Sequence, residues 1–236
     1  MPTVEELKEQ AELGKPICII PAKGGSKRLP HKNKLCINGK PLYKYAIDTA
    51  KDAKLFDAII VSSDDEEILE GAYESEVVVH KRPDALAGSD SQIKHTIKYI
   101  AGVYKFPAVF CLLTPCNPLR TAQDLVEGYK LFRDKEANYV MSVVQDRPVE
   151  LSLKLKNGMI EPRKELLQAQ KYKPVYRHDG NFIFARSEIF FIEFEWGFYG
   201  SKNYPYVVKH PTVDIDTESD FRYAEYLMNR TELENV

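Results

Sequence analysis

The chain has 236 residues, a length that suits one α/β domain or one domain with a modest appendage. With 44% hydrophobic and 29% charged residues it has the composition of a globular protein that buries a sizeable core. Its formal net charge of −2 argues against broad binding to nucleic acid, which needs a large positive field. Any affinity for phosphates must therefore come from a local cluster of cations.

Two further features concern compartment and redox state. Apolar runs such as Ala108–Leu113 are far shorter than the roughly 20 residues that cross a bilayer, so we expect no membrane partner. The first ten residues, MPTVEELKEQ, are polar and acidic, unlike a signal peptide. The four cysteines show neither a paired metal-ligand spacing nor a disulfide framework. We therefore expect a reducing cytoplasm.

Expected strands and helices alternate along the first 145 residues. A short helix over Val4–Leu13 should end at Gly14. The expected strands that follow are Ile17–Ile20, Ala58–Val61, Glu76–Val79, Val109–Leu113 and Tyr139–Val144. The expected helices between them are Pro41–Lys51, one that opens at Asp64–Ile68, Ser91–Tyr104 and Ala122–Phe132. This alternation predicts an α/β fold with a doubly wound, mostly parallel sheet that binds ligands at the carboxyl ends of its strands.

The region from Arg147 to Pro174 interrupts this alternation. It is interpreted as a hairpin-like insertion whose turn is Asn157-Gly158, a favoured hairpin pair, between strands at Leu151–Leu155 and Met159–Ile160. The expected elements after it are the strands Asn181–Ala185 and Tyr206–Lys209 and a helix near Asp220–Met228. We interpret residues 1–236 as a single domain with this insertion inside it.

The loop after the first strand carries the strongest chemical signal. It contains five cations near a pair of glycines and a serine: Lys23, Gly24, Gly25, Ser26, Lys27, Arg28, Lys32 and Lys34. Glycines let the backbone approach a ligand and present its N–H groups, and the cations supply the charge that a triphosphate needs. The loop has neither the P-loop spacing nor the dinucleotide-binding spacing, and a solvated basic loop is the alternative. Its position after a buried strand favours a phosphate cradle.

Five segments in order resemble one known family. The stretch Ile19–Asn33 resembles the signature of the sugar-acid cytidylyltransferases, which make CMP-sialic acid and CMP-activated relatives such as legionaminic and pseudaminic acid. The four later segments that resemble the family's motifs are Lys81–Ala87, Pro115–Thr121, Tyr176–Asn181 and Val213–Glu218. The resemblance implies a nucleotidyltransferase that converts CTP and a 2-keto-3-deoxy sugar acid to a CMP-sugar and pyrophosphate. It also implies a homodimer in which residues 147–174 cross to the partner.

The resemblance assigns roles on the nucleotide side. Lys32 is implied to be catalytic, contacting the α-phosphate where charge develops, and Asn33 to help hold the nucleotide. The residues implied to cradle the triphosphate are Lys23, Gly24, Gly25, Ser26 and Lys27, with Arg28 as a further candidate. Arg82 and Ser89 fall where the family recognises the base and the ribose; a surface ion pair is the alternative for Arg82.

Metal and sugar candidates lie in the later motifs. Asp214 and Asp216 alternate across Ile215, so in an extended segment both carboxylates face one side and suit Mg²⁺; a solvated turn is the alternative. Asp216 is also implied to be catalytic. Arg177 is the candidate for the carboxylate of the sugar, with a structural ion pair as its alternative. Thr114 and Gln168 are further candidates for contacting the sugar.

The sequence departs from the family at three places. Lys23 replaces an arginine and so keeps the charge but loses the bidentate fork. Thr114 stands where the sialic-acid enzymes generally have a glutamine, and His178–Asn181 replaces a commoner Pro-Asn-Gly-Ala. The last two changes fall on the sugar side, so we expect CTP together with a sugar acid that need not be ordinary N-acetylneuraminate.

Two alternative functions stay open. One is a sugar-1-phosphate nucleotidyltransferase that uses another nucleoside triphosphate. The other is a nucleotide-binding or regulatory protein that has kept the cradle and lost catalysis. The intact Lys32 and the pair Asp214 and Asp216 argue against the second.

Overall fold

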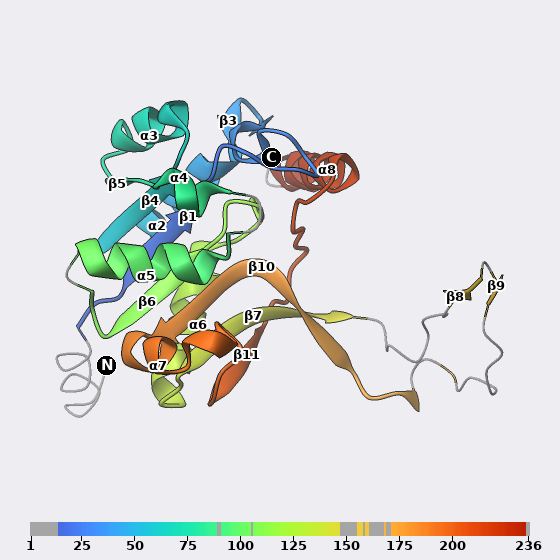
Figure 1. The fold of residues 1–236 in the computed structure, drawn as a ribbon. Coiled ribbons are helices and arrows are strands. Elements are labelled where there is room, and N and C mark those ends of the chain that lie inside the picture. The colour runs from blue at the N-terminus through green and yellow to red at the C-terminus, as the bar shows by residue number, and fades with distance from the viewer. Residues whose placement is uncertain are drawn as a thin grey trace.

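The fold is seen in a computed structural model that describes residues 14–88, 91–104, 106–146, 155–157, 159–160, 168 and 171–234. Its centre is a seven-stranded sheet in the order β11-β7-β10-β6-β1-β4-β5. The strands are β1 (Ile17–Pro21), β4 (Ala58–Ser63), β5 (Val78–Lys81), β6 (Val109–Leu113), β7 (Tyr139–Asp146), β10 (Val175–Arg186) and β11 (Asn203–Val207). Figure 1 shows this sheet with helices on either side.

The sheet is mostly parallel, as predicted. β1 pairs in parallel with β4 and with β6, β4 with β5, and β7 with β11. The exception is β10, which lies between β6 and β7 and runs antiparallel to both. The expected strand Asn181–Ala185 is the inner part of β10, but its place in the sheet was not predicted. β7 and β10 also extend beyond the body of the sheet (Figure 1).

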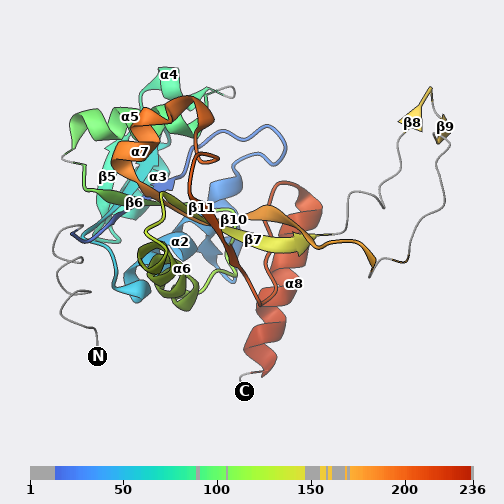
Figure 2. The same ribbon diagram turned by 90° about the horizontal axis from the view of Figure 1, so that it is seen from below.

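Helices cover both faces of the sheet because the strand residues alternate between two cores. Cys18 and Ile20 point into one core with α2 (Leu42–Ala53), α3 (Glu66–Tyr73) and α6 (Ala122–Asp134). Ile17 and Ile19 point into the other, with α5 (Ile93–Val103) and α7 (Ser187–Ile192). Figure 2 shows α2 and α6 on one side of the sheet and α5 and α7 on the other. Both faces are buried, which is why β1 and β6 are continuous apolar runs.

The remaining elements are short or lie at the periphery. They are η1 (Lys32–Lys34), β2 (Cys36–Ile37), β3 (Lys40–Pro41), α4 (Asp84–Ala87), β8 (Leu155–Lys156), β9 (Met159–Ile160), η4 (Phe194–Trp196) and α8 (Glu218–Glu234). A third, smaller core joins α8 to the residues that follow β1, through Phe221, Ile215 and Leu29. No helix within the described ranges is long and apolar enough to span a membrane.

Most predicted elements are confirmed, with shifted ends where a local feature decides. β5 begins at Val78 because Glu76, at φ 55°, closes a turn after α3. β11 begins at Asn203 and contains Pro205, which lacks an N–H and is tolerated because β11 is an edge strand. The predicted hairpin is present as β8 and β9 around Asn157, at φ 51°. The predicted helix Val4–Leu13 and residues 151–154 lie outside the described residues.

Candidate active site

The basic loop leaves the carboxyl end of β1 at the middle of the sheet. Ala22 is buried, and its amide donates to the carbonyl of Ser62 (2.9 Å), so the loop starts in register with β4. The loop ends in η1, where Asn33 is buried and donates through Nδ2 to the carbonyl of Lys23 (2.8 Å). This bond holds the two ends of the loop together, and the residues between them lie at the edge of the sheet.

Lys32 connects the loop to the closing motif of the chain. Its Nζ donates to the carbonyl of Ile215 (2.6 Å) and to Oδ1 of Asp216 (3.0 Å). Arg28 contacts the other oxygen of the same carboxylate, with 2.8 Å between Nη2 and Oδ2. Segments far apart in the sequence are therefore joined at one carboxylate.

Two adjacent pockets lie around Lys32. The first, here called the loop pocket, has a volume of about 280 Å³ and is lined by Lys23, Gly25, Ser26, Lys27, Arg28, Lys32, Asn33 and Asp216. The second, here called the sheet-edge pocket, has a volume of about 250 Å³ and is lined by Pro21, Lys23, Lys32, Asn33, Arg82, Ser91, Ile93, Thr96, Leu112, Thr114, Pro115 and Cys116. Lys23, Lys32 and Asn33 line both, so the pockets meet at the residues predicted to bind the nucleotide.

The two glycines of the loop have different roles. Gly24 is buried, and its N–H already donates to Oδ1 of Asp64 (2.9 Å). A Cβ at Gly24 would lie 2.8 Å from Cβ of Asp65, so glycine is required there for close packing. A Cβ at Gly25 would meet open space. We expected both backbones to cradle phosphates; in this structure only Gly25 lines the loop pocket, and the amide of Gly24 is engaged elsewhere.

Arg82 is buried, so the alternative of a surface ion pair is wrong. It is 5% exposed, and its guanidinium donates from Nη2 to the carbonyl of Ser62 (3.0 Å) and from Nε to Oγ of the same serine (3.3 Å). Burial lowers the pKa of Arg82, and the Asp64 carboxylate opposes that effect. A buried guanidinium that lines the sheet-edge pocket is well placed to donate to a ligand. Ser89 lies outside the described residues.

The two aspartates of the closing motif alternate as predicted but have different surroundings. Val213 and Ile215 are buried, and Asp214 and Asp216 are half-buried on the other side of the segment. Asp216 lines the loop pocket and pairs with Arg28 and Lys32. The carboxylate of Asp214 packs against Gly180, where a Cβ would lie 2.7 Å from its Cγ. The expected common face exists, and each carboxylate has its own environment along it.

Cys116 and Thr114 also line the sheet-edge pocket. Burial raises the pKa of the Cys116 thiol to about 12, and the nearby charge of Asp214 adds to the effect. The thiol donates to Oγ1 of Thr114 (3.3 Å), whose hydroxyl donates to the carbonyl of Gly180. Thr114 thus lines the pocket with its hydroxyl proton directed to the backbone of β10, and its role on the sugar side stays a prediction.

Two other sugar-side candidates are not in either pocket. Arg177 is exposed near the outer end of β10, and its Nε pairs with Oδ2 of Asp146 on β7 (3.2 Å). This is the structural ion pair that was the alternative for Arg177. Gln168 is exposed, and its carbonyl accepts from the amide of Lys171 (2.8 Å). Within one copy of the chain, neither residue is brought to the pockets.

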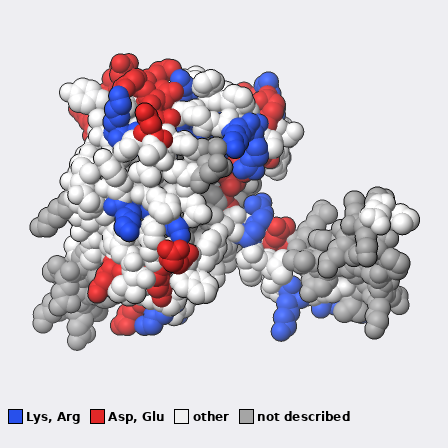
Figure 3. All heavy atoms as spheres, viewed as in Figure 1, with Lys and Arg blue, Asp and Glu red and all other residues white. Residues whose placement is uncertain are grey.

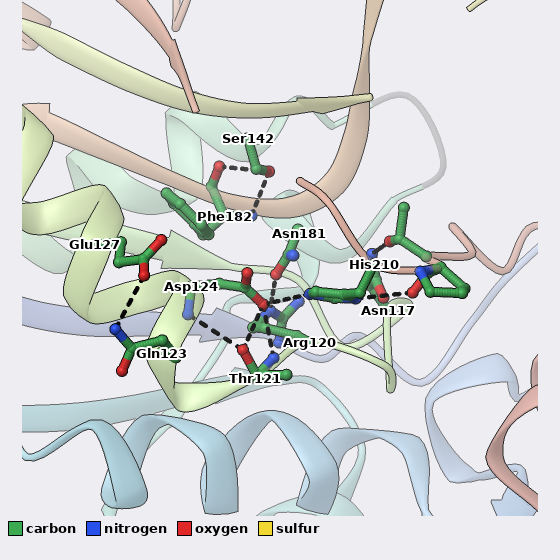
Figure 4. A network of polar contacts seen from close by, with 12 residues as sticks. Asn117, Arg120, Thr121, Gln123, Asp124, Glu127, Ser142, Asn181, Phe182 and His210 are labelled. Carbon is green, nitrogen blue, oxygen red and sulfur yellow. Dashed lines mark hydrogen bonds and ion pairs between the residues drawn. The ribbon is translucent and has the colours of Figure 1, made fainter. Parts of the chain in front are cut away.

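A buried polar network behind the pockets joins two of the recognised motifs (Figure 4). Arg120 donates from Nε to Oδ1 of Asn181 (2.5 Å) and from Nη2 to the carbonyl of Thr114 (2.6 Å). Asp179, fully buried, accepts from Oγ of Ser142 (2.6 Å) and from the amide of Asn181 (3.1 Å). Arg120, Asp179 and Asn181 lie in segments that resemble family motifs, but the sequence alone assigns them no role. The signal that could have found them is a polar side chain within such a segment.

The same network anchors the segment that leads from β11 to the two aspartates. Nε2 of His210 lies 2.8 Å from Oδ2 of Asp124 in the first turn of α6, a contact visible in Figure 4. Asp124 also forms a capping box with Thr121. The bond to Asp124 raises the pKa of His210, and burial opposes it. The approach to Asp214 and Asp216 is therefore fixed to the start of a helix.

The chemistry available at this site is that of phosphate binding. Cationic side chains from Lys23, Lys27, Arg28 and Lys32 line the loop pocket together with a single carboxylate. No group of three or more His, Cys, Asp or Glu side chains in the described part of the chain forms a metal cage. An enclosed metal centre is thus not seen there, whereas an open carboxylate site that shares a metal with substrate phosphates needs only one or two such ligands.

Comparison with known proteins identifies relatives over most of the chain. A family model described as cytidylyltransferase matches residues 17–233. The chain is 29% identical over 223 residues to the pseudaminic acid cytidylyltransferase of Campylobacter jejuni, with 90% of this chain and 96% of that protein covered. It is 31% identical over 216 residues to the N-acylneuraminate cytidylyltransferase of Streptococcus agalactiae, with 88% of this chain and 52% of that protein covered.

A solved structure shares the fold. CMP:2-keto-3-deoxy-manno-octonic acid synthetase in complex with CTP superposes with a TM-score of 0.68 and covers 92% of this chain and 100% of that one. At 15% identity this likeness concerns the fold alone.

Proposed function

The chain belongs to the cytidylyltransferase family and is a nucleotidyltransferase, and from this premise we propose that it joins CTP to a 2-keto-3-deoxy sugar acid of the sialic-acid-like nonulosonate type. The products are a CMP-sugar and pyrophosphate. The observation that carries the proposal is the position of Lys32, which lines both pockets and is bonded to the closing motif.

The reaction needs little covalent chemistry from the protein. The anomeric hydroxyl oxygen of the sugar bonds to the α-phosphorus, the bond from that phosphorus to the bridging oxygen breaks, and pyrophosphate leaves with the electron pair. The hydroxyl proton is released. Catalysis of such a step rests on positioning and on stabilising the charge that develops on the phosphoryl oxygens.

Lys32 suits that stabilising role. Its ammonium is held by two acceptors from one segment, so it does not need to reorganise when charge develops. The loop pocket beside it, with Lys23, Ser26 and Lys27, is the proposed site of the triphosphate tail. Arg82 in the sheet-edge pocket is the proposed contact of the base or ribose, because its buried guanidinium faces a largely apolar pocket of suitable size.

The carboxylates fit a divalent cation. Asp214 and Asp216 project from one side of an extended segment, and Mg²⁺ is commonly held by one or two carboxylates together with substrate phosphates. When bound, Mg²⁺ would withdraw charge from the phosphoryl oxygens and lower the pKa of the attacking hydroxyl. Thr114 and Cys116, beside Asp214, mark the proposed acceptor side.

The second part of the proposal concerns assembly. β7 and β10 extend beyond the sheet and lead into the 147–174 region, and we infer that this arm contacts a second copy in a homodimer. Such an arrangement would account for Arg177 and Gln168 being remote from the pockets of their own chain. Sedimentation or light scattering should then give twice the mass of the chain, and a monomer at assay concentrations would contradict the assembly.

The decisive experiment measures pyrophosphate release. The protein is incubated with CTP, Mg²⁺ and a panel of acidic sugars that includes pseudaminic, legionaminic and N-acetylneuraminic acids and 2-keto-3-deoxy-octonic acid. Release with CTP and one or more of these acids, and not with ATP, GTP or UTP, is the expected result. Release only with a sugar-1-phosphate and another nucleotide, or CTP binding without turnover on any acid, would refute the proposal.

A further inference from the structure

Two consecutive aspartates follow β4 and sit beside the basic loop without lining either pocket. Asp64 accepts the N–H of Gly24 through Oδ1 at 2.9 Å, which fixes the first turn of the loop. This bond joins positions 40 residues apart in the sequence. Because an amide bonded to a carboxylate makes a strong hydrogen bond, Asp64 sets the direction in which the backbone leaves Gly24.

Asp65 fixes the other end of the loop. Its Oδ2 lies 2.9 Å from Nζ of Lys34, the last cation of the loop, while Oδ1 accepts the amide of Ile68 and caps α3. Lys34 is also bonded to Glu67 of α3 (2.8 Å). Hydrogen bonds from Lys34 and from the α3 backbone lower the pKa of Asp65, although burial, the largest single influence, opposes them. The carboxylate is therefore charged at neutral pH.

The packing leaves little space between Gly24 and Asp65. Asp65 is so close to the loop that a Cβ on Gly24 would lie 2.8 Å from both its Cβ and its Oδ2. Between the fixed ends, Gly25, Lys27 and Arg28 are exposed and line the loop pocket. In Figure 3 the acidic side chains over α3 lie next to basic ones at the upper edge of the molecule. The loop is thus attached near its two ends to the aspartates that precede α3, at Gly24 and at Lys34. Between these ends, Arg28 and Lys32 pair with Asp216.

The charge of these aspartates makes a direct role in binding unfavourable. A triphosphate carries several negative charges, and a carboxylate near it is repulsive unless a cation lies between them. Oδ1 of Asp64 accepts a backbone amide, and Oδ2 of Asp65 pairs with a lysine. Neither residue lines the loop pocket. What they contribute is the shape of the loop, at some electrostatic cost.

From these contacts we propose that Asp64 and Asp65 are positioning residues that hold the 23–34 loop in its triphosphate-binding form. The inference rests on the proposed function for the identity of the ligand. A loop that is competent only part of the time binds its ligand more weakly in proportion to the competent fraction. Loosening either attachment should therefore raise the KM for CTP and leave kcat, the rate at saturating CTP, nearly unchanged.

The test compares an isosteric with a truncating substitution. Asp64→Asn keeps an oxygen that can accept the Gly24 amide and removes the charge, whereas Asp64→Ala removes the acceptor. Asp64→Ala should raise KM for CTP about tenfold with kcat within about twofold, consistent with loss of one charge-assisted hydrogen bond. Asp64→Asn should stay within about threefold of the wild type in KM.

Asp65→Ser provides a second variant, because serine still caps α3 but cannot pair with Lys34. It should raise KM for CTP about threefold. The matched control is Asp48→Ala, which removes the surface pair between Lys40 and Asp48 on α2, remote from the pockets, and should change nothing. Calorimetric titration with CTP and Mg²⁺ measures the same loss in affinity without turnover, and thermal unfolding confirms that each variant is folded.

The outcomes separate the two proposals. If the wild type binds CTP but releases no pyrophosphate with any acid, the proposed function fails while the calorimetric comparison still tests the loop. If Asp64→Ala and Asp64→Asn weaken CTP binding equally, charge and not the hydrogen bond is responsible, and the positioning role is overturned. A fall in kcat at unchanged KM would overturn it as well. Should Asp64→Ala not fold, a KM for Asp65→Ser equal to that of Asp48→Ala would have the same effect.

Discussion

Gly180 offers a way to disturb one carboxylate of the site without touching it. Its φ is +70°, and it lies within β10 where the register with β7 shifts between His178 and Ile183. A Cβ there would lie 2.7 Å from Cγ of Asp214 and 2.8 Å from its Oδ1. Gly180→Ala therefore strains the backbone and pushes the Asp214 carboxylate out of its place.

The backbone strain should appear in the stability of the variant, and the displacement of Asp214 should appear in its activity. A left-handed backbone costs an L-residue about 1–2 kcal/mol, and this appears in the free energy of unfolding. The contact involves the end of a side chain that can rotate, so most of it should be relieved by movement of Asp214 and not by unfolding. A reacting group misplaced by about 1 Å can cost up to about 10²-fold in rate. We expect kcat/KM for CTP to fall at least tenfold, about 1.4 kcal/mol.

Gly39→Ala is the matched control. Gly39 has a φ of +75°, and a Cβ there would meet nothing within 4 Å. Alanine at position 39 therefore brings a similar backbone strain without displacing a functional group. The free energies of unfolding of the two variants in urea should agree within about 0.5 kcal/mol. In the pyrophosphate assay only Gly180→Ala should lose activity. Wild-type activity and an unchanged Mg²⁺ response in Gly180→Ala would refute the reasoning, because Asp214 would then not need its observed position.

Two other predictions concern the cation at the centre of the site and the half-buried His210, which pairs with Asp124. Lys32→Met keeps much of the apolar stem and removes the charge beside Asp216, so kcat should fall about 10²–10³-fold with little change in urea stability; retained kcat would exclude Lys32 from charge stabilisation. The pKa of His210 is raised above its usual 6.5, so its pairing with Asp124 stabilises the fold fully below about pH 6.5 and less as pH rises through the folded-state pKa. The difference in unfolding free energy between wild type and His210→Gln should therefore shrink from pH 6 to pH 9, and a constant difference would contradict the pairing.

The sequence predicted the central strands well because their burial is two-sided. β6 was predicted with its observed ends, since a strand covered on both faces is a continuous apolar run. The insertion of β10 between β6 and β7 could not be predicted in the same way. Strand order and direction depend on contacts across the sheet, and nothing in the local pattern of residues 175–186 distinguishes a parallel from an antiparallel neighbour.

The structure brings several of the predicted site residues together, although their roles stay predictions. Lys23, Lys32 and Asn33 line both pockets, at the sheet edge where the cations that follow the first strand indicated a ligand site and where the family resemblance placed Asn33. Arg177 shows what motif resemblance cannot predict. Its motif runs along β10, so that Asn181 is buried behind the pocket while Arg177 lies at the exposed end of the strand. Resemblance identified the segment, but only the fold places each side chain of it.

The residues that shape the loop were missed for a different reason. Asp64 and Asp65 precede an apolar-periodic helix, and an aspartate in that position is fully explained as a helix cap. Their contacts with Gly24 and Lys34 lie at the two ends of the loop and join residues that are far apart in the sequence. A residue that satisfies a local rule gives no sign of a second, distant partner.

The two cations on Asp216 are unequal, and this inequality bears on how the site accepts its ligand. The side chain of Arg28 is 69% exposed, so its ion pair contributes at most about 1 kcal/mol. Lys32 is 15% exposed and is also bonded to the carbonyl of Ile215, so it is held in place. Phosphates that enter the loop pocket can therefore draw Arg28 away at little cost, whereas Lys32 stays. That exchange would free one oxygen of Asp216, and a carboxylate oxygen is the donor type that the proposed Mg²⁺ ion would take.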